Sequence, residues 1–199
     1  MYRLPDVKAD YTLNYVIKND GSIQINATLE LPSDSETPEL PRMGMRFGLP
    51  SNYNQIQWYG RGPFENYADR NTASLLGVYD DNTDNGWTRN YVRPQESGYK
   101  TDTRWVKLTN TEGVGLSVEG LQPICFSAMS QVTEDFDEGT VKKNRHVTDI
   151  VKRPFVTLHI DLGQRGVGGD NSWGAETHEP YRLKGKKYTY GFVIRPIGK

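Results

Sequence analysis

The sequence predicts an all-β fold, an antiparallel sandwich or barrel. Short segments in which apolar and polar residues alternate recur along the 199-residue chain, and turn-forming residues separate them. No segment keeps the helical apolar period of about 3.6 residues for more than two turns. A chain of this length can bury a sizeable core, so its size is no obstacle to folding.

The first third of the chain predicts a hairpin, a connector and two further strands. Two alternating runs at residues 16–25 flank an Asn-Asp-Gly turn, which is among the strongest local signals for a β-hairpin. The prolines of residues 31–41 are typical of a surface loop. Residues 43–49 then alternate with the period of a half-buried strand, and residues 56–59 form another short strand.

The second half of the chain repeats this pattern. Its predicted strands cover residues 105–108, 114–118, 124–129, 156–162, 181–183 and 188–194. The first two of these form a second hairpin, and the last two form a third around a Lys-Gly-Lys turn. The strand at residues 156–162 leads directly into a glycine-rich loop.

Residues 60–70 mix turn formers, charges and aromatic side chains. Four charged residues could form an ion-pair network that pins this loop, or could line a polar cleft: Arg61, Glu65, Asp69 and Arg70. We favour the structural role. We expect Asn66 to join Glu65, Asp69 and Arg70 in a buried or half-buried network.

The glycine-rich loop at residues 166–174 ends on one large aromatic residue, Trp173. Glycine permits sharp turns and close backbone approach, and short polar side chains can hydrogen-bond the backbone of such a turn. An exposed indole among polar groups offers a flat face to the C–H edges of a sugar. The substrate-binding candidates are therefore Trp173 and its supporting residues Gly168, Gly169, Asp170, Asn171 and Ser172. The alternative is that Trp173 folds back as a lid over the core, because tryptophan is highly buried on average.

Opposite charges nearly cancel in this chain. There are 24 basic and 25 acidic residues, a formal net charge of −1 and a sequence pI near 6.3. This balance gives no electrostatic footprint for nucleic acid or an anionic membrane, so neutral partners are favoured. No apolar run approaches the roughly 18 residues of a membrane span. The start of the chain resembles the middle of a protein, so we expect a fragment, and the compartment, cytoplasmic or periplasmic, stays open.

Candidate metal and nucleophile sites are weak. Residues 80–86 imitate a calcium loop, but Asn85 stands where glycine is needed and Tyr91 where the bidentate glutamate belongs. The single cysteine, Cys125, excludes an intrachain disulfide and lies in an apolar run typical of a buried, inert thiol. We interpret His159 as a hydrogen-bonded structural histidine. No metal or cofactor is expected in this chain.

Two further motifs are set aside. Residues 166–171 begin the G-x-G-x-x-G pattern of dinucleotide sites, but Asn171 replaces the last glycine and no apolar helix follows. Residues 134–145 carry charges of both signs, including Lys142 and Lys143. Mixed charge indicates a surface loop rather than a nucleic-acid patch.

Four segments together resemble the C-terminal "small chain" domain of the large multidomain β-galactosidases of the LacZ type, in glycoside hydrolase family 2. They cover residues 40–44, 58–70, 91–96 and 166–173. The most specific are G-P-x-E-N-Y-x-D-R at residues 62–70 and G-G-D-x-S-W at residues 168–173.

This resemblance implies a galactose mutarotase-like β-supersandwich that occupies residues 1–199 as one domain, C-terminal to a catalytic (β/α)₈ barrel. In the family the barrel carries both glutamates of a retaining mechanism, so the chain alone is expected to be inactive. Trp173 would reach into the barrel's pocket and complete it as a platform for a β-galactoside. The parent is expected to be a homo-oligomer, with any divalent cation in its barrel. Contacts of Arg61, Glu65 or His178 with ligand are left open.

Two other functions remain as alternatives. A stand-alone aldose 1-epimerase would share the fold, but it needs a histidine and a carboxylate around the sugar's ring oxygen, and no motif here supplies that pair. A free carbohydrate-binding module would also present an exposed tryptophan. An upstream reading frame that encodes a barrel with paired glutamates would distinguish the enzyme domain from both.

Overall fold

A computed structural model describes residues 2–4, 8–37, 39–92, 96–137, 139, 145–171 and 173–198. Within these residues ten β-strands pair antiparallel, which confirms the predicted all-β class. No helix in the described part of the chain is long and apolar enough to cross a membrane.

The strands follow each other along the chain with few helical residues between them. They are β1 (Tyr2–Leu4), β2 (Ala9–Ile17), β3 (Ile23–Glu30), β4 (Arg42–Pro50), β5 (Gln55–Gly62), β6 (Leu75–Asn82), β7 (Lys100–Thr109), β8 (Gly115–Met129), β9 (Phe155–Gln164) and β10 (Lys187–Ile197). The helical elements are the short helix α1 (Thr133–Phe136) and the 3₁₀ turns η1 (Thr83–Asn85), η2 (Val147–Asp149) and η3 (Glu179–Tyr181).

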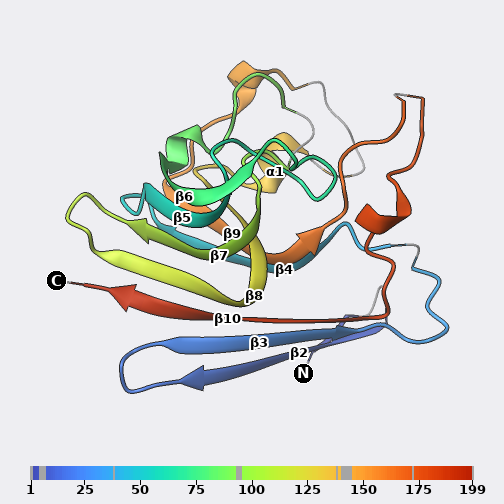
Figure 1. Ribbon diagram of the computed structural model, residues 1–199, viewed down its shortest axis with the longest axis horizontal. Coiled ribbons are helices and arrows are strands. Elements are labelled where there is room, and N and C mark those ends of the chain that lie inside the picture. The colour runs from blue at the N-terminus through green and yellow to red at the C-terminus, as the bar shows by residue number, and fades with distance from the viewer. Residues whose placement is uncertain are drawn as a thin grey trace.

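The longest strand, β8, belongs to two layers at once. Its residues 115–120 pair with β10, which continues through β3 and β2, whereas its residues 125–129 pair with β9, which continues into β4. On its other side β8 pairs with β7, followed by β5 and β6. Figure 1 shows β8 curving from the lower strands β2, β3 and β10 toward the upper strands.

A bulge bends β8 between its two halves. Glu119 pairs with Trp105 and Ile124 pairs with Thr103, so more residues separate the pairing positions on β8 than on β7. Such an insertion kinks a strand and increases its twist. Glycine at position 120 permits the bend, because a Cβ there would lie 2.2 Å from a backbone oxygen of the same strand.

The core lies between the two layers. The Tyr190 hydroxyl on β10 donates to the Ile160 carbonyl on β9 at 3.1 Å, and the rings of Phe47 on β4 and Phe192 on β10 meet edge to face at 6.1 Å. Because β10 pairs with neither β9 nor β4, these contacts cross the gap between layers. Burying one large apolar side chain there contributes about 1.5–3 kcal/mol.

Two predicted hairpins are confirmed. β2 and β3 flank a turn in which the Lys18 amide donates to the Ser22 carbonyl at 2.9 Å, and Gly21 has a φ of +78°. β7 and β8 form the second hairpin, where Gly113 has a φ of +80°. Both glycines occupy the left-handed region that other residues rarely adopt.

The third predicted hairpin is wrong. Leu183 pairs with Leu40 in an isolated bridge, and β10 pairs with β3 and β8 instead of with residues 181–183. The Arg182 guanidinium donates to the Glu39 carboxylate at 2.6 Å, which holds this segment against the chain before β4. The turn signal is local, so it does not show that β3 and β8 pair with β10 over more residues than residues 181–183 could.

Two other parts of the chain differ from expectation. Strand β6 was not predicted. The charged segment at residues 134–145 begins as helix α1, with Phe136 fully buried and Asp135 almost so, because the Asp135 carboxylate accepts from the Arg153 guanidinium at 3.1 Å. Two lysines of the segment lie outside the described residues: Lys142 and Lys143.

Two glycines of β4 provide a matched test of the packing. A Cβ on Gly44 would lie 1.7 Å from Oδ1 of Asp161, whereas a Cβ on Gly48 would meet nothing within 4 Å. We therefore expect Gly44→Ala to lower the free energy of unfolding by about 1–3 kcal/mol or more, through overpacking. Gly48→Ala should leave it unchanged within about 1 kcal/mol. Equal shifts in chemical denaturation would contradict this packing.

Candidate functional site

Trp173 stands at the tip of a loop between β9 and η3. Its side chain is 93% exposed, so the alternative of a lid folded over the core is wrong for this chain. Figure 1 shows the loop, in orange and red, extending away from both layers before it returns to η3. Strand β9 leads directly into this loop, as the sequence predicts.

Polar contacts shape the turn around Trp173. Oδ1 of Asn171 accepts from the Trp173 amide at 2.8 Å, which is the predicted bond between a short polar side chain and its own backbone. The Asp170 carboxylate instead contacts Nε2 of His178 at 2.8 Å and so links the two arms of the loop. Gly174 has a φ of +96°, so the left-handed residue follows the tryptophan. Ser172 lies outside the described residues.

Asp69, from the loop after β5, holds the start of the Trp173 loop. Its carboxylate accepts from the Gly168 amide at 2.8 Å and from the Val167 amide at 3.2 Å. Hydrogen bonds to an ionised acceptor are roughly twice as strong as neutral ones. The two sequence motifs, about 98 residues apart, therefore meet at one side chain.

The glycines of the loop act mainly through close approach. A Cβ on Gly166 would lie 2.7 Å from the Asp69 carboxyl group, and a Cβ on Gly169 would lie 2.4 Å from the Ala175 carbonyl oxygen. Gly168 has more room, since a Cβ there would lie 3.4 Å from Asp69. The expectation that glycine lets this backbone approach its neighbours is confirmed at positions 166 and 169.

Further bonds close the base of the loop. The Gly166 amide donates to the Tyr181 carbonyl at 2.8 Å, and the Thr177 hydroxyl donates to the Gly166 carbonyl at 3.1 Å. Thr177 is buried, so these bonds are shielded from water. The base is thus fixed on both arms, while the Trp173 side chain at the tip is exposed.

Of the predicted polar network of Glu65, Asn66, Asp69 and Arg70, only the contact between Glu65 and Arg70 exists, while Asn66 bonds to other partners. The Glu65 carboxylate accepts from the Gly98 amide at 2.9 Å and from Arg70 at 3.0 Å, and Tyr91 also donates to it. Burial opposes its ionisation, but these donors outweigh burial, so the pKa of Glu65 is lowered. Asn66 is fully buried and accepts from the Thr101 amide at 3.0 Å.

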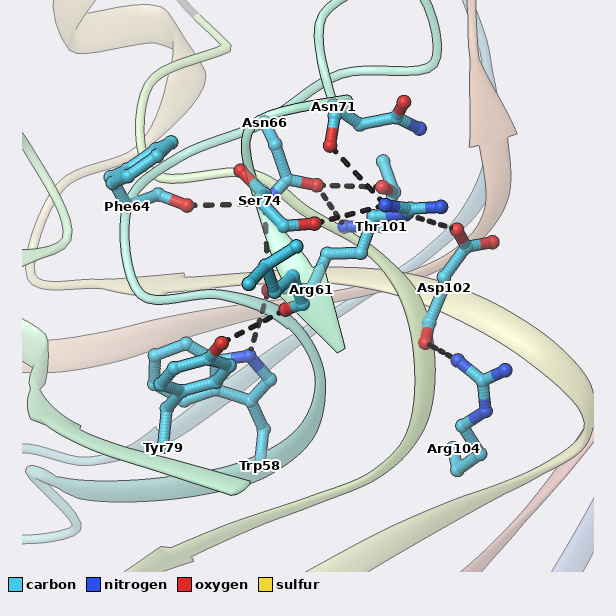
Figure 2. Close-up of polar contacts among 11 residues, drawn as sticks. Trp58, Arg61, Phe64, Asn66, Asn71, Ser74, Tyr79, Thr101, Asp102 and Arg104 are labelled. Carbon is cyan, nitrogen blue, oxygen red and sulfur yellow. Dashed lines mark hydrogen bonds and ion pairs between the residues drawn. The ribbon is translucent and has the colours of Figure 1, made fainter. Parts of the chain in front are cut away.

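Arg61 and Asp69 do not belong to this network, so the four-residue ion-pair interpretation is wrong. The Arg61 guanidinium donates to the Ser74 carbonyl at 2.9 Å, to the Asn71 carbonyl at 3.3 Å and to the Asp102 carboxylate at 2.5 Å. Figure 2 shows these three partners around Arg61. Arg61 thus ties the loop before β6 to β7. The sequence contained no signal that these partners would be close.

The other candidate residues have structural surroundings. Nδ1 of His159 accepts from Arg42 at 3.0 Å, as an arginine can only donate, which confirms the hydrogen-bonded interpretation. Burial raises the pKa of Cys125 to about 12, which agrees with an inert thiol. Asp84 pairs with Lys152 at 2.6 Å in the region that resembles a calcium loop, and no metal-binding cluster of three ligands occurs among the described residues.

Asp69→Ala tests the tie between the two motifs. The amides of Val167 and Gly168 should lose protection from hydrogen exchange, and the free energy of unfolding should fall by about 1–3 kcal/mol, because two charge-assisted bonds disappear. Asp84→Ala is the control, since it removes an exposed ion pair worth about 0–1 kcal/mol. Unchanged exchange at both amides in Asp69→Ala would show that the carboxylate does not hold the loop.

His159 provides a test of pH dependence. Burial, then the nearby charges of Arg42 and Arg46, lower its pKa to about 4. Since the folded pKa lies below the unfolded value of about 6.5, the stabilisation is complete above pH 6.5 and is lost as the pH falls toward 4. We expect the His159 ring to titrate with a midpoint near pH 4 by NMR. Between pH 6.5 and 4, the free energy of unfolding of His159→Gln should fall by about 1–3 kcal/mol less than that of the wild type, because glutamine does not titrate. A midpoint near 6.5 would contradict this environment.

Comparison with known proteins places the chain in a family. The family described as "Beta galactosidase small chain" matches residues 1–194. A β-galactosidase of Priestia megaterium is 36% identical over 187 residues, which are 93% of this chain and 17% of that protein. A β-galactosidase of Halalkalibacterium halodurans is 33% identical over 178 residues, again 17% of its length.

Among solved structures, a galactose mutarotase related enzyme from Lactobacillus acidophilus aligns with 96% of this chain and 62% of its own, with a TM-score of 0.43 and 14% identity. The chain spans about 17% of the length of the first two β-galactosidases that it matches. Because the family match extends over residues 1–194, this chain belongs to the β-galactosidase small chain family.

Proposed function

We propose that residues 1–199 are one domain of a larger retaining β-galactosidase of glycoside hydrolase family 2, which hydrolyses terminal non-reducing β-D-galactose residues. This domain completes the sugar-binding pocket of a separate catalytic (β/α)₈ barrel in the same polypeptide. The relatives named β-galactosidase support the proposal, because the matched region is only 17% of their length and leaves room for a catalytic domain.

The observation that carries the proposal is the 93% exposure of Trp173 on a loop whose base is fixed. An indole so exposed adds little to the core, whereas its flat face can stack on a sugar for about 1–2 kcal/mol. The bonds from Asp69 and Tyr181 hold the base of the loop, so less entropy is lost when a ligand binds at the tip. These features suit a platform offered to a neighbouring domain.

The chemistry is assigned to the barrel. A retaining glycosidase needs two carboxyl groups about 5–5.5 Å apart on either side of the glycosidic bond. The acidic residues around the Trp173 loop serve other bonds, since Asp69 holds backbone amides and Asp170 pairs with His178. We expect this chain alone to be inactive and to need no cofactor, with any divalent cation in the barrel and the parent assembled as a homo-oligomer.

Trp173→Ala in the full-length enzyme tests the proposal. KM should rise about five- to thirtyfold, because about 1–2 kcal/mol of stacking is lost, while kcat should fall less if the platform holds substrate and transition state alike. Trp173→Phe should restore part of the affinity, because it keeps a smaller flat face.

The control is Tyr15→Ala, which removes a 54% exposed aromatic side chain from β2, away from the loop. Its KM should stay at the wild-type value. If Trp173→Ala instead leaves KM unchanged and abolishes cooperative unfolding, Trp173 is a structural residue and the proposed role is wrong.

A further inference from the structure

A contact between Asp170 and His178 joins the two arms of the Trp173 loop beyond its base. Nε2 of His178 lies 2.8 Å from Oδ1 of Asp170. Asp170 precedes Trp173 by three residues and His178 follows it by five, so the contact crosses the loop close to its tip. The side chains of His178 and Asp170 are 61% and 75% exposed, and an exposed ion pair adds little to the stability of a fold. The effect of this pair is therefore local to the loop.

His178 projects from a part of the backbone that is held on both sides. Thr177, just before it, is buried, and its hydroxyl donates to the Gly166 carbonyl at 3.1 Å. The His178 carbonyl accepts from the Tyr181 amide at 2.9 Å, where η3 begins. A side chain on a held backbone loses less entropy when it forms a bond. His178 therefore offers a fixed point to the opposite arm.

The outgoing arm is guided in steps toward Trp173. Asp69 accepts from the Gly168 amide at 2.8 Å, and a Cβ on Gly169 would lie 2.4 Å from the carbonyl oxygen of the returning arm. Asp170 comes next and bonds to His178. Asn171 follows, and its Oδ1 accepts from the Trp173 amide at 2.8 Å. These contacts extend from the base of the loop to the backbone of Trp173.

The chemistry of the pair suits a clasp. An ionised carboxylate can only accept, so Nε2 of His178 carries the proton and donates to Asp170. We infer that Asp170 and His178 are positioning residues, whose bond holds Trp173 in the orientation in which its indole meets the sugar. The expected effect on catalysis rests on the proposed function of Trp173, whereas the expected effect on the loop does not.

The first test is NMR relaxation of the Trp173 backbone amide in the 199-residue chain. His178→Ala should lower its order parameter toward the flexible range below about 0.6, because the clasp is lost. His178→Gln should keep the wild-type value, because its side-chain amide retains a donor. Lys184→Ala is the matched control, since it removes an exposed ion pair with Glu179 at 2.6 Å that does not cross the loop. It should leave the order parameter unchanged.

The second test measures KM in the full-length enzyme. His178→Ala should raise KM about two- to fivefold, the range expected for loss of one exposed ion pair, and should change kcat less. Asp170→Ala should do the same, because it removes the other partner. His178→Gln should restore most of the affinity. In a Trp173→Ala background, His178→Ala should leave KM unchanged, because the clasp acts through the indole.

Two results would overturn the inference. One is an unchanged Trp173 order parameter in His178→Ala. The other is an equal rise in KM with and without Trp173, which would mean that His178 acts on the substrate independently of the indole. If Trp173→Ala leaves KM unchanged while His178→Ala still lowers the order parameter, the proposed function is wrong and the clasp stands.

Discussion

Strand β8 hydrogen-bonds to β10 with its first half and to β9 with its second, so both layers of the protein share one continuous backbone. The bulge after Glu119 makes this possible, because the extra residues bend the strand without ending its pairing with β7. The position of β9 follows from that bend, and β9 delivers the Trp173 loop.

The Trp173 loop combines a fixed base with an exposed aromatic side chain at its tip. Asp69 accepts from two backbone amides at its start, and Tyr181 accepts from Gly166 beside them, whereas the indole of Trp173 remains 93% exposed. Holding the base lowers the entropy that binding at the tip would cost. An exposed side chain contributes little to the stability of the fold. In this loop, the residues that stabilise the base are therefore different from the residue proposed to bind a sugar.

Charged side chains near the candidate site are mostly neutralised within the chain. Arg61 pairs with Asp102, and Glu39 accepts from Arg182, while Glu65 is held by Arg70, Tyr91 and a backbone amide. Such pairs leave little unbalanced field to attract an ion. The nearly balanced composition of the whole chain agrees with this local pattern and favours neutral partners.

The sequence by itself determined the all-β class, two hairpins and a polar, glycine-rich turn around Trp173, because alternation, left-handed glycines and short polar side chains act over a few residues. The exposure of Trp173, which the sequence left open, was decided by the tertiary structure. Only the tertiary structure decided that β10 pairs with β3 and β8, that Asp69 reaches Gly168, and that Arg61 reaches Asp102. These partners lie far apart along the chain. Their contacts depend on which strands and loops the whole fold brings together, and no local pattern records that arrangement.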